Sequence, residues 1–380
     1  MIPKQIEQGE GRRKLAFPLF VLGLSLLAWT PSCGEAPNPT TSTENEGEQA
    51  RRIQGSTMGT TWSASLYGAS QEEDWEALLQ AMLDEIEGAL TTWNPESELM
   101  RFNASESVYP KTLDASEHLG RCVLSAIQAT LATNGAFDPT LQPAVDLWGF
   151  GATRDRPIPS EEELAAVLQI LGAKHLHASS LLTLDQSISW KIAKRISEVQ
   201  VDLSAIAKGY AADRLFGLAY SGGCTGGLIE VGGEIRVFGA RDGGGPWRVG
   251  VEEPASHPGA PKVIGTILGL DPDSQLSAVA TSGDSRNRRT VGDFTFSHII
   301  DPRTGRPLVD PPASVTVVAK DCATADAWAT ALLVLGPEEG LPLAEENGLE
   351  VCFQLRNEDG SYGEVATEGY EALVVERLNR

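Results

Sequence analysis

Apolar residues recur along the first half of the folded part with two periods, which predict a mixture of strands and helices. Residues 60–67 alternate between apolar and polar positions, the period of a half-buried strand. Residues 74–90 carry apolar side chains at the three- and four-residue spacing of an amphipathic helix, at Leu78, Leu79, Met82, Ile86 and Leu90. Further helices are expected at about 117–133 and after Ser160, which precedes Glu163 at the spacing of a capping box.

The second half reads as short strands separated by Gly and Pro turns. A helix is expected to begin near residue 202 and another to run from 323 to 335. The strands are expected at about 228–231, 235–238, 247–251, 263–268, 314–319 and 349–355. Short strands joined by turns pair in an antiparallel way. With helices on their flanks they predict an α+β fold, an antiparallel β-sheet core flanked by helices.

The first 50 residues have a different pattern. Arg12, Arg13 and Lys14 lead into an apolar run at 15–29, which ends just before Cys33. A run of about 15 residues is shorter than the ~20 that span a membrane, and its charged-then-apolar order is typical of an export signal. We expect residues 1–33 to be a signal peptide that ends at a lipidated Cys33, with a plain secretory signal as the alternative. Residues 34–50 then form a flexible tether, and residues 51–380 form the folded domain.

Charge and cysteine content narrow the function class and leave the redox state open. The chain has 30 Lys and Arg against 52 Asp and Glu, a net charge of −22, which argues against a nucleic-acid partner. Four cysteines follow Cys33 at spacings that match no metal motif, namely Cys122, Cys224, Cys322 and Cys352. They allow three disulfide pairings, so one bridge and buried free thiols both remain open.

Two segments carry polar groups that suit a flat, phosphorylated ligand. Residues 135–140 form a turn with Asp138 at its tip, followed by aromatics among glycines at 147–151. Such a loop lays backbone against a planar ring, or it is an ordinary turn. Asp202 and Lys208 stand near the start of a helix, where free amides bind phosphate. The alternative is a capping side chain with a solvated lysine.

Two further segments suggest acid–base and metal chemistry. His298 lies in an apolar, strand-like run that ends with Asp301 at a chain reversal, so it is either part of a polar site or a packed core residue. Asp326 and Thr330 stand four residues apart on an Ala-rich helix and project from one face. Oxygen ligands at this spacing suit Mg²⁺. The alternative is a helix-terminal Asp with a Thr bonded back to the chain.

Taken together and in this order, the motifs resemble those of the FAD:protein FMN transferases, the ApbE family of flavin transferases. The resemblance covers nearly everything from residue 55 to the end. Its matching segments are 57–60, 93–99, 135–140, 146–151, 202–210, 231–235, 280–283, 298–307 and 325–332. Three positions depart from the common pattern: Trp93 replaces a Tyr, Glu234 replaces an Asp or Asn, and Asp284-Ser285 stands where an aromatic often follows.

The resemblance implies an α+β fold whose cleft holds FAD as substrate. It places Met58 and Trp93 near the flavin and the loop of Ala136, Phe137 and Asp138 on the cofactor. Asp202, Lys208 and His298 would be further FAD contacts. The metal, Mg²⁺, would be held by the backbone carbonyl of Ala205 with Asp326 and Thr330.

The implied reaction is the Mg²⁺-dependent transfer of FMN from FAD to a Thr hydroxyl of an acceptor redox-complex subunit, with release of AMP. His298 or Asp301 would act as the general base. The implied location is the periplasmic face of a membrane in a bacterial cell envelope, where the chain is anchored by lipid. Two alternatives remain: an FAD pyrophosphatase that gives FMN and AMP, and a non-enzymatic flavin-binding lipoprotein.

Overall fold

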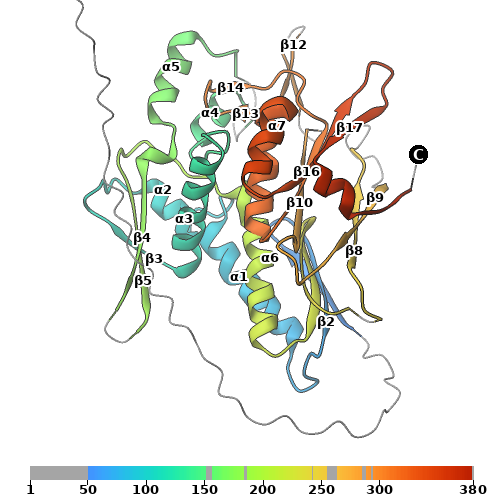
Figure 1. Cartoon of the computed structure of the whole chain (residues 1–380). Coiled ribbons are helices and arrows are strands. Elements are labelled where there is room, and N and C mark those ends of the chain that lie inside the picture. The colour runs from blue at the N-terminus through green and yellow to red at the C-terminus, as the bar shows by residue number, and fades with distance from the viewer. Residues whose placement is uncertain are drawn as a thin grey trace, which may run out of the picture. The chain divides into compact units, whose positions relative to one another are not determined.

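An eight-stranded antiparallel sheet forms the centre of the structure, a computed structural model (Figure 1). The structure describes residues 50–150, 156–183, 186–241, 243–254, 263–284, 288–291 and 294–378. In spatial order, the sheet consists of β1 (Arg51–Thr57), β2 (Thr60–Tyr67), β6 (Gly226–Val231), β7 (Glu234–Gly239), β10 (Ala278–Gly283), β15 (Ser314–Ala319), β16 (Glu350–Arg356) and β17 (Tyr362–Ala366).

Smaller sheets and the helices surround this sheet. Two three-stranded sheets have the orders β3 (Leu113–Ala115), β5 (Ile188–Lys194), β4 (Leu176–Leu182) and β18 (Val374–Arg377), β9 (Ile264–Leu270), β8 (Trp247–Glu252). Two hairpins pair β11 (Arg288–Val291) with β12 (Phe294–Ser297) and β13 (Ile300–Asp301) with β14 (Arg306–Pro307). The helices are α1 (Trp75–Leu90), α2 (Glu98–Ala104), α3 (Glu117–Ala132), α4 (Gln142–Leu147), α5 (Glu161–Ile170), the 3₁₀ turn Ala173–His175, α6 (Ser204–Ser221), α7 (Cys322–Glu346) and α8 (Glu368–Leu373).

Alternate side chains of the central strands pack into two different hydrophobic cores, one on each face of the large sheet. In β15, Val315 and Val317 belong to the main core together with residues of α6 and α7. Val318 of the same strand belongs to a second core, with residues of β8 and β9. Successive side chains of a strand point to opposite faces, so helices cover one face and the β8–β9–β18 sheet covers the other. These layers confirm the expected α+β fold.

Most expected elements lie within a few residues of their predicted bounds, and one helix is longer than expected. The helix expected at 323–335 continues as α7 to Glu346, across a kink at Gly336 with φ +68°. A left-handed Gly followed by Pro ends one helical segment and begins the next, because Pro lacks the amide that a first-turn residue does not need.

Within the described residues, no helix combines the length and apolarity needed to cross a membrane. Cys122, Cys224, Cys322 and Cys352 are buried free thiols.

Close packing of α6 against α7 sets the position of the buried polar groups described below. A Cβ atom on Gly209 of α6 would lie 2.2 Å from the carbonyl oxygen of Cys322, so only glycine permits this approach. Asp213 of α6 also accepts hydrogen bonds from the amides of Cys322 and Ala323, both at 2.9 Å. One helix therefore caps the N-terminus of the other and fixes their register.

Candidate active site

A buried cluster of three charged side chains lies where α6, α7 and β7 meet. Lys208 Nζ lies 2.7 Å from Glu234 Oε1 and 3.5 Å from Asp326 Oδ1, and both carboxylates are buried. Burial lowers the pKa of Lys208, but the carboxylates of Asp326 and Glu234 outweigh it and raise the pKa above its usual value. Burial, followed by repulsion from Asp326, raises the pKa of Glu234. Lys208 is thus held as a paired cation, and the solvated lysine considered from the sequence is wrong.

The cluster has more negative oxygen than Lys208 can neutralise. Its two carboxylates face one ammonium group, and Glu234 Oε2 is buried without a hydrogen-bond partner among the described residues. A buried, unpaired carboxylate oxygen is costly unless a cation or a proton compensates it. The raised pKa of Glu234 means that a proton compensates this carboxylate when no cation does. The hard oxygens of the two carboxylates are also of the kind that Mg²⁺ prefers.

Two of the three expected metal ligands, the Ala205 carbonyl and Asp326, lie at the α6–α7 contact. An α-helix normally directs the amide of Gly209 at the carbonyl of Ala205, four residues earlier. This amide also donates to Asp326 Oδ2 at 3.0 Å, so the Ala205 carbonyl and the Asp326 carboxylate meet at one N–H group. Thr330 follows Asp326 by one helical turn, and its hydroxyl lies 3.2 Å from Ser282 Oγ. Asp326 does not cap its own helix, because Asp321 is the N-cap of α7.

Among the described residues, no three His, Cys, Asp or Glu side chains form a metal-binding group. The expected set contains one carboxylate, one hydroxyl and one backbone carbonyl, so it depends on oxygen chemistry rather than on a cluster of ionisable side chains. That donor set fits Mg²⁺, which keeps water and phosphate oxygens among its ligands.

Two hairpin turns bring Met58 to the edge of this cluster. Met58 and Gly59 form the two-residue loop between β1 and β2, with φ values of +49° and +71°. A positive φ is strained for Met, and here the amide of Met58 donates to Glu87 Oε2 at 3.0 Å. The β6–β7 turn lies alongside, since a Cβ atom on Gly232 would approach the Thr60 and Lys208 side chains within 3 Å.

The loop of Ala136, Phe137 and Asp138 is joined by its backbone to the start of α6. The amide of Asp202 donates to the Pro139 carbonyl at 2.8 Å, immediately after Asp138. Ala136 and Phe137 point into the main core, so the loop offers backbone rather than these side chains to a ligand. Burial raises the pKa of Asp138, although hydrogen bonds from Thr140 oppose this shift.

Asp202 performs a local task as well. Its Oδ1 accepts the amide of Ser204 at 2.8 Å, whereas the N-cap position of α6 belongs to Leu203, which has no capping side chain. Asp202 therefore stabilises the first turn of α6 from the residue before the N-cap, and not from the N-cap position itself.

His298 lies beside Asp284, the residue that directly follows β10. It follows β12 at a bend, and its side chain is 33% exposed, so it is neither in a strand nor in the core. Its Nδ1 lies 4.0 Å from Oδ1 of Asp284, a carboxylate with no exposed surface that follows β10 directly. Ser297 Oγ donates to the same carboxylate, and Arg356 lies 3.7 Å from its other oxygen.

Asp301 and Trp93 have different settings. Asp301 is buried, and both of its oxygens accept hydrogen bonds from the Arg303 guanidinium at 3.0 to 3.2 Å. A proton-accepting role would have to break this pair.

Trp93 is 93% exposed, and its amide donates to Thr91 Oγ1 within its own loop. The described contacts do not bring Trp93 to the remaining predicted residues.

Comparison with known proteins shows the family of this chain. A sequence model of the ApbE family matches residues 58–353. The chain belongs to the ApbE family. It is 33% identical over 368 residues to an Escherichia coli K12 protein named FAD:protein FMN transferase, covering 96% of this chain and 97% of that one. A Vibrio cholerae protein of the same name is 36% identical over 335 residues, covering 87% and 94% of the two chains.

Solved structures of the family give the same result for the fold. The apo flavinyl transferase ApbE of Pseudomonas stutzeri superposes with a TM-score of 0.72 at 30% identity, covering 88% of this chain and 100% of that one. The flavin transferase ApbE of Vibrio cholerae gives a TM-score of 0.69 at 35% identity, covering 85% and 99%. The resemblance stated from the sequence is therefore confirmed, together with the α+β fold and the transferase class that it implies.

Within this ApbE-family chain, sequence reasoning missed three polar residues of the site. Asp284 directly follows 280–283, a matching segment of the family pattern, and the sequence marks it as a departure from that pattern, as it does Glu234, and not as a site residue. The signal available was a carboxylate directly after an apolar strand. Arg356, which faces Asp284 from β16, gave no signal, because 72 residues separate the two in sequence.

Proposed function

We propose that the chain is a Mg²⁺-dependent FAD:protein FMN transferase that places FMN on a Thr hydroxyl of an acceptor redox subunit. Transfer of FMN from FAD to protein follows from family membership. What we propose beyond this is that the reaction needs Mg²⁺, that the acceptor group is a Thr hydroxyl, and that the acceptor protein is a redox subunit. The observation that carries it is the buried Lys208, Glu234 and Asp326 cluster beside the Ala205 carbonyl and Thr330, which suits a cation and a pyrophosphate together.

The proposed step is an in-line displacement at the phosphorus of the FMN half of FAD. The acceptor oxygen forms a new P–O bond, the pyrophosphate P–O bond to AMP breaks, and AMP leaves with the bridging oxygen and its electron pair. Mg²⁺, when bound, neutralises charge on the pyrophosphate oxygens. Lys208 lies 3.5 Å from Asp326 and supplies a positive charge beside the proposed metal site, where it would attract a phosphate oxygen.

The proton of the acceptor hydroxyl needs an acceptor in the enzyme. His298 is the better of the two candidates, because one-third of its side chain is exposed, whereas both oxygens of Asp301 are committed to Arg303. Asp284 Oδ1 lies 4.0 Å from His298 Nδ1, where its negative charge would attract the positive charge that the ring gains with the proton. Asp301 and Arg303 instead stabilise the turn that follows His298.

The test mixes the protein with FAD, Mg²⁺ and the soluble domain of a redox subunit that carries a Thr in a Ser/Thr-Gly-Ala/Ser-Thr-like segment. We expect AMP and a fluorescent, covalently flavinylated acceptor to appear in equal amounts. EDTA, or Thr→Val in the acceptor, should stop both. AMP with free FMN and an unlabelled acceptor would identify a pyrophosphatase instead. Bound FAD without AMP would identify a flavin-binding protein with no enzymatic activity.

We also propose that the chain is exported and held at the periplasmic face of a membrane by lipid on Cys33. The charged-then-apolar leader at 12–29 and the polar tether at 34–50 support this proposal. Residues 1–49, Cys33 included, lie outside the described residues.

Cys33→Ser is expected to move the protein from the membrane fraction to the soluble or unprocessed fraction. A single acyl chain binds a membrane marginally, whereas the several chains of a bacterial lipoprotein give stable anchoring. Fractionation and intact-mass measurement of both forms check this, with FAD binding of the purified variant as the control for folding. Wild-type protein found wholly in the soluble periplasm, and cleaved after Cys33, would rule out the lipid anchor while leaving export in place.

A further inference from the structure

Met58 has a backbone conformation that its side chain does not favour. The two-residue loop between β1 and β2, Met58 and Gly59, has φ values of +49° and +71°. Positive φ at both central positions is the pattern of a type I′ turn, which prefers Asn followed by Gly. Gly59 meets this preference, whereas Met58 is strained, and such strain persists only where the surrounding structure enforces it.

Glu87 of α1 is the side chain that holds this loop. Its Oε2 accepts the amide of Met58 at 3.0 Å and the hydroxyl of Thr57 at 3.3 Å. A hydrogen bond to a charged group is stronger than a neutral one, which suits a bond that opposes strain. Thr57 is 4% exposed, so water has little access to replace its partner. One carboxylate oxygen therefore ties the end of β1 and the start of the turn to the helix.

A second side chain of α1 holds the same hairpin further from its tip. Gln80 Oε1 accepts the indole N–H of Trp62 at 2.8 Å, and Gln80 Nε2 donates to the Ser56 carbonyl at 3.2 Å. Gln80 and Glu87 are separated by two helical turns, so both project from one face of α1. The attachment of the hairpin to α1 thus has another support, while the contact of Glu87 is specific to the turn.

The strained turn lies beside the charged groups of the active site. Gly232 of the β6–β7 turn separates Thr60 from Lys208, since a Cβ atom there would lie 2.8 Å from Thr60 Cγ2 and 2.9 Å from Lys208 Cδ. The amide of Gly232 also donates to the Thr61 carbonyl at 3.0 Å. Met58 is partly buried against the main core. Its thioether is a polarisable group that packs well against an aromatic ring.

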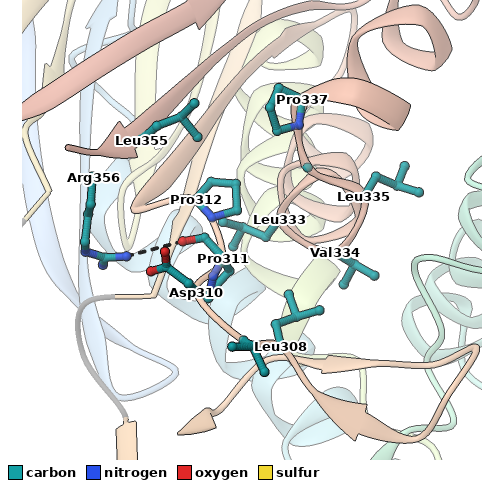
Figure 2. A pocket seen from close by; sticks show the side chains of 12 residues that line it. Leu308, Asp310, Pro311, Pro312, Leu333, Val334, Leu335, Pro337, Leu355 and Arg356 are labelled. Carbon is teal, nitrogen blue, oxygen red and sulfur yellow. Dashed lines mark hydrogen bonds between the residues drawn. The ribbon is translucent and has the colours of Figure 1, made fainter. Parts of the chain in front are cut away.

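The hollow at the kink of α7 does not include this loop (Figure 2). Its walls are residues 308–312, 333–337, 355 and 356, whereas Thr57 and Glu87 belong to β1 and α1. Met58 therefore meets a ligand from the side of the site that the two hairpin turns form, and not from the α7 kink.

We infer that Glu87 is a positioning residue, which holds Met58 in its strained conformation so that the thioether meets the flavin ring of FAD. The inference rests on the proposed function, because it takes FAD as the ligand. Glu87 acts through Met58, since the donors that it binds belong to the β1–β2 hairpin. A turn with Asn or Gly in place of Met58 would close the hairpin with less strain but would carry no such group.

The FAD Kd, measured by calorimetry, tests this role. Glu87→Ala frees the turn and is expected to raise the Kd at least about tenfold, whereas Glu87→Gln keeps an oxygen for the Met58 amide and should stay within about threefold of wild type. In a Met58→Gly background, Glu87→Ala is expected to change the Kd by less than about twofold, because no side chain remains to be positioned.

Gln80→Ala is the matched control, because it weakens the same hairpin from the same helix, away from the turn. It leaves the indole N–H of the buried Trp62 without its partner, so it should lower the melting temperature at least as much as Glu87→Ala does. The FAD Kd of this control should change by less than about twofold.

An FAD Kd unchanged in Glu87→Ala, or raised equally in Glu87→Ala and Gln80→Ala, would overturn the inference. A rise in Kd that is equally large in the Met58→Gly background would do the same. So would a Kd unchanged in Met58→Gly alone, a result that does not depend on the folding of Glu87→Ala. Failure of the proposed function is distinguishable. Wild-type protein that binds FAD without labelling the acceptor would overturn the transfer and leave the Kd comparison to decide the role of Glu87, whereas wild-type protein that binds no FAD would overturn both.

Discussion

Asp326→Ala is expected to lower Mg²⁺-dependent FMN transfer by at least about 10³, with the fold retained. Asp326 is the single charged member of the proposed metal set, and charge stabilisation by a metal supplies several kcal/mol in the transition state, at about 1.4 kcal/mol per tenfold change in rate. The fold should persist because Lys208 keeps Glu234 as a partner at 2.7 Å, which leaves a neutral buried pair. The measurements are AMP release and Mg²⁺ binding by calorimetry.

Asp326→Asn separates charge from shape in the same experiment. The amide oxygen still accepts the hydrogen bond from the Gly209 N–H, so packing of α6 on α7 is preserved while the charge is removed. The matched control is Asp321→Ala on the same helix, which removes the N-cap and should cost about 1 kcal/mol of stability without changing Mg²⁺ affinity. Normal Mg²⁺-dependent turnover in Asp326→Ala would move the metal site elsewhere.

Residues related by local spacing were predictable, because helical geometry fixes their relative positions. Asp326 and Thr330 share a face of α7 as their four-residue spacing requires, and Ser160 with Glu163 forms the expected capping box. The end of the first part of α7 was also predictable, since Gly336 and Pro337 mark it in the sequence. The segment beyond it was not predicted, although Pro337 after Gly336 is also a signal for the start of a new helix.

Partners that come from distant segments could not be predicted. Lys208 has the same local sequence whether it is solvated or buried, and only the α6–α7–β7 junction decides that it pairs with Glu234 and Asp326. His298 looked like a strand residue because Ile299 and Ile300 follow it. The strand ends there because Ser297 Oγ donates to Asp284 and accepts the amide of Ile299, a side-chain bond that competes with strand pairing.

His298→Ala is expected to lower turnover by about 10² to 10⁴, the usual contribution of general acid–base catalysis, while FAD affinity changes much less. The reason is the position of the ring, which is one-third exposed and lies beside the buried carboxylate of Asp284. Asp284 directly follows β10, and Ser282 near the end of that strand contacts the proposed metal ligand Thr330. Melting temperature, FAD affinity and AMP release are measured on the same preparation. His177→Ala is the matched control, because His177 lies on β4 of a separate sheet, against Tyr109.

The three measurements distinguish three roles for the ring. A packed core residue would cost ~2 to 5 kcal/mol of stability on truncation to Ala, with binding and turnover falling together, yet a side chain that is one-third exposed leaves a smaller cavity than that range assumes. Loss of FAD affinity at unchanged stability would make His298 a cofactor contact. The base would then have to be Asp301, freed from its pair with Arg303. Near-normal AMP release and acceptor labelling would exclude His298 from catalysis, and Asp284 would then be a buried charge held by Arg356 for structural reasons alone.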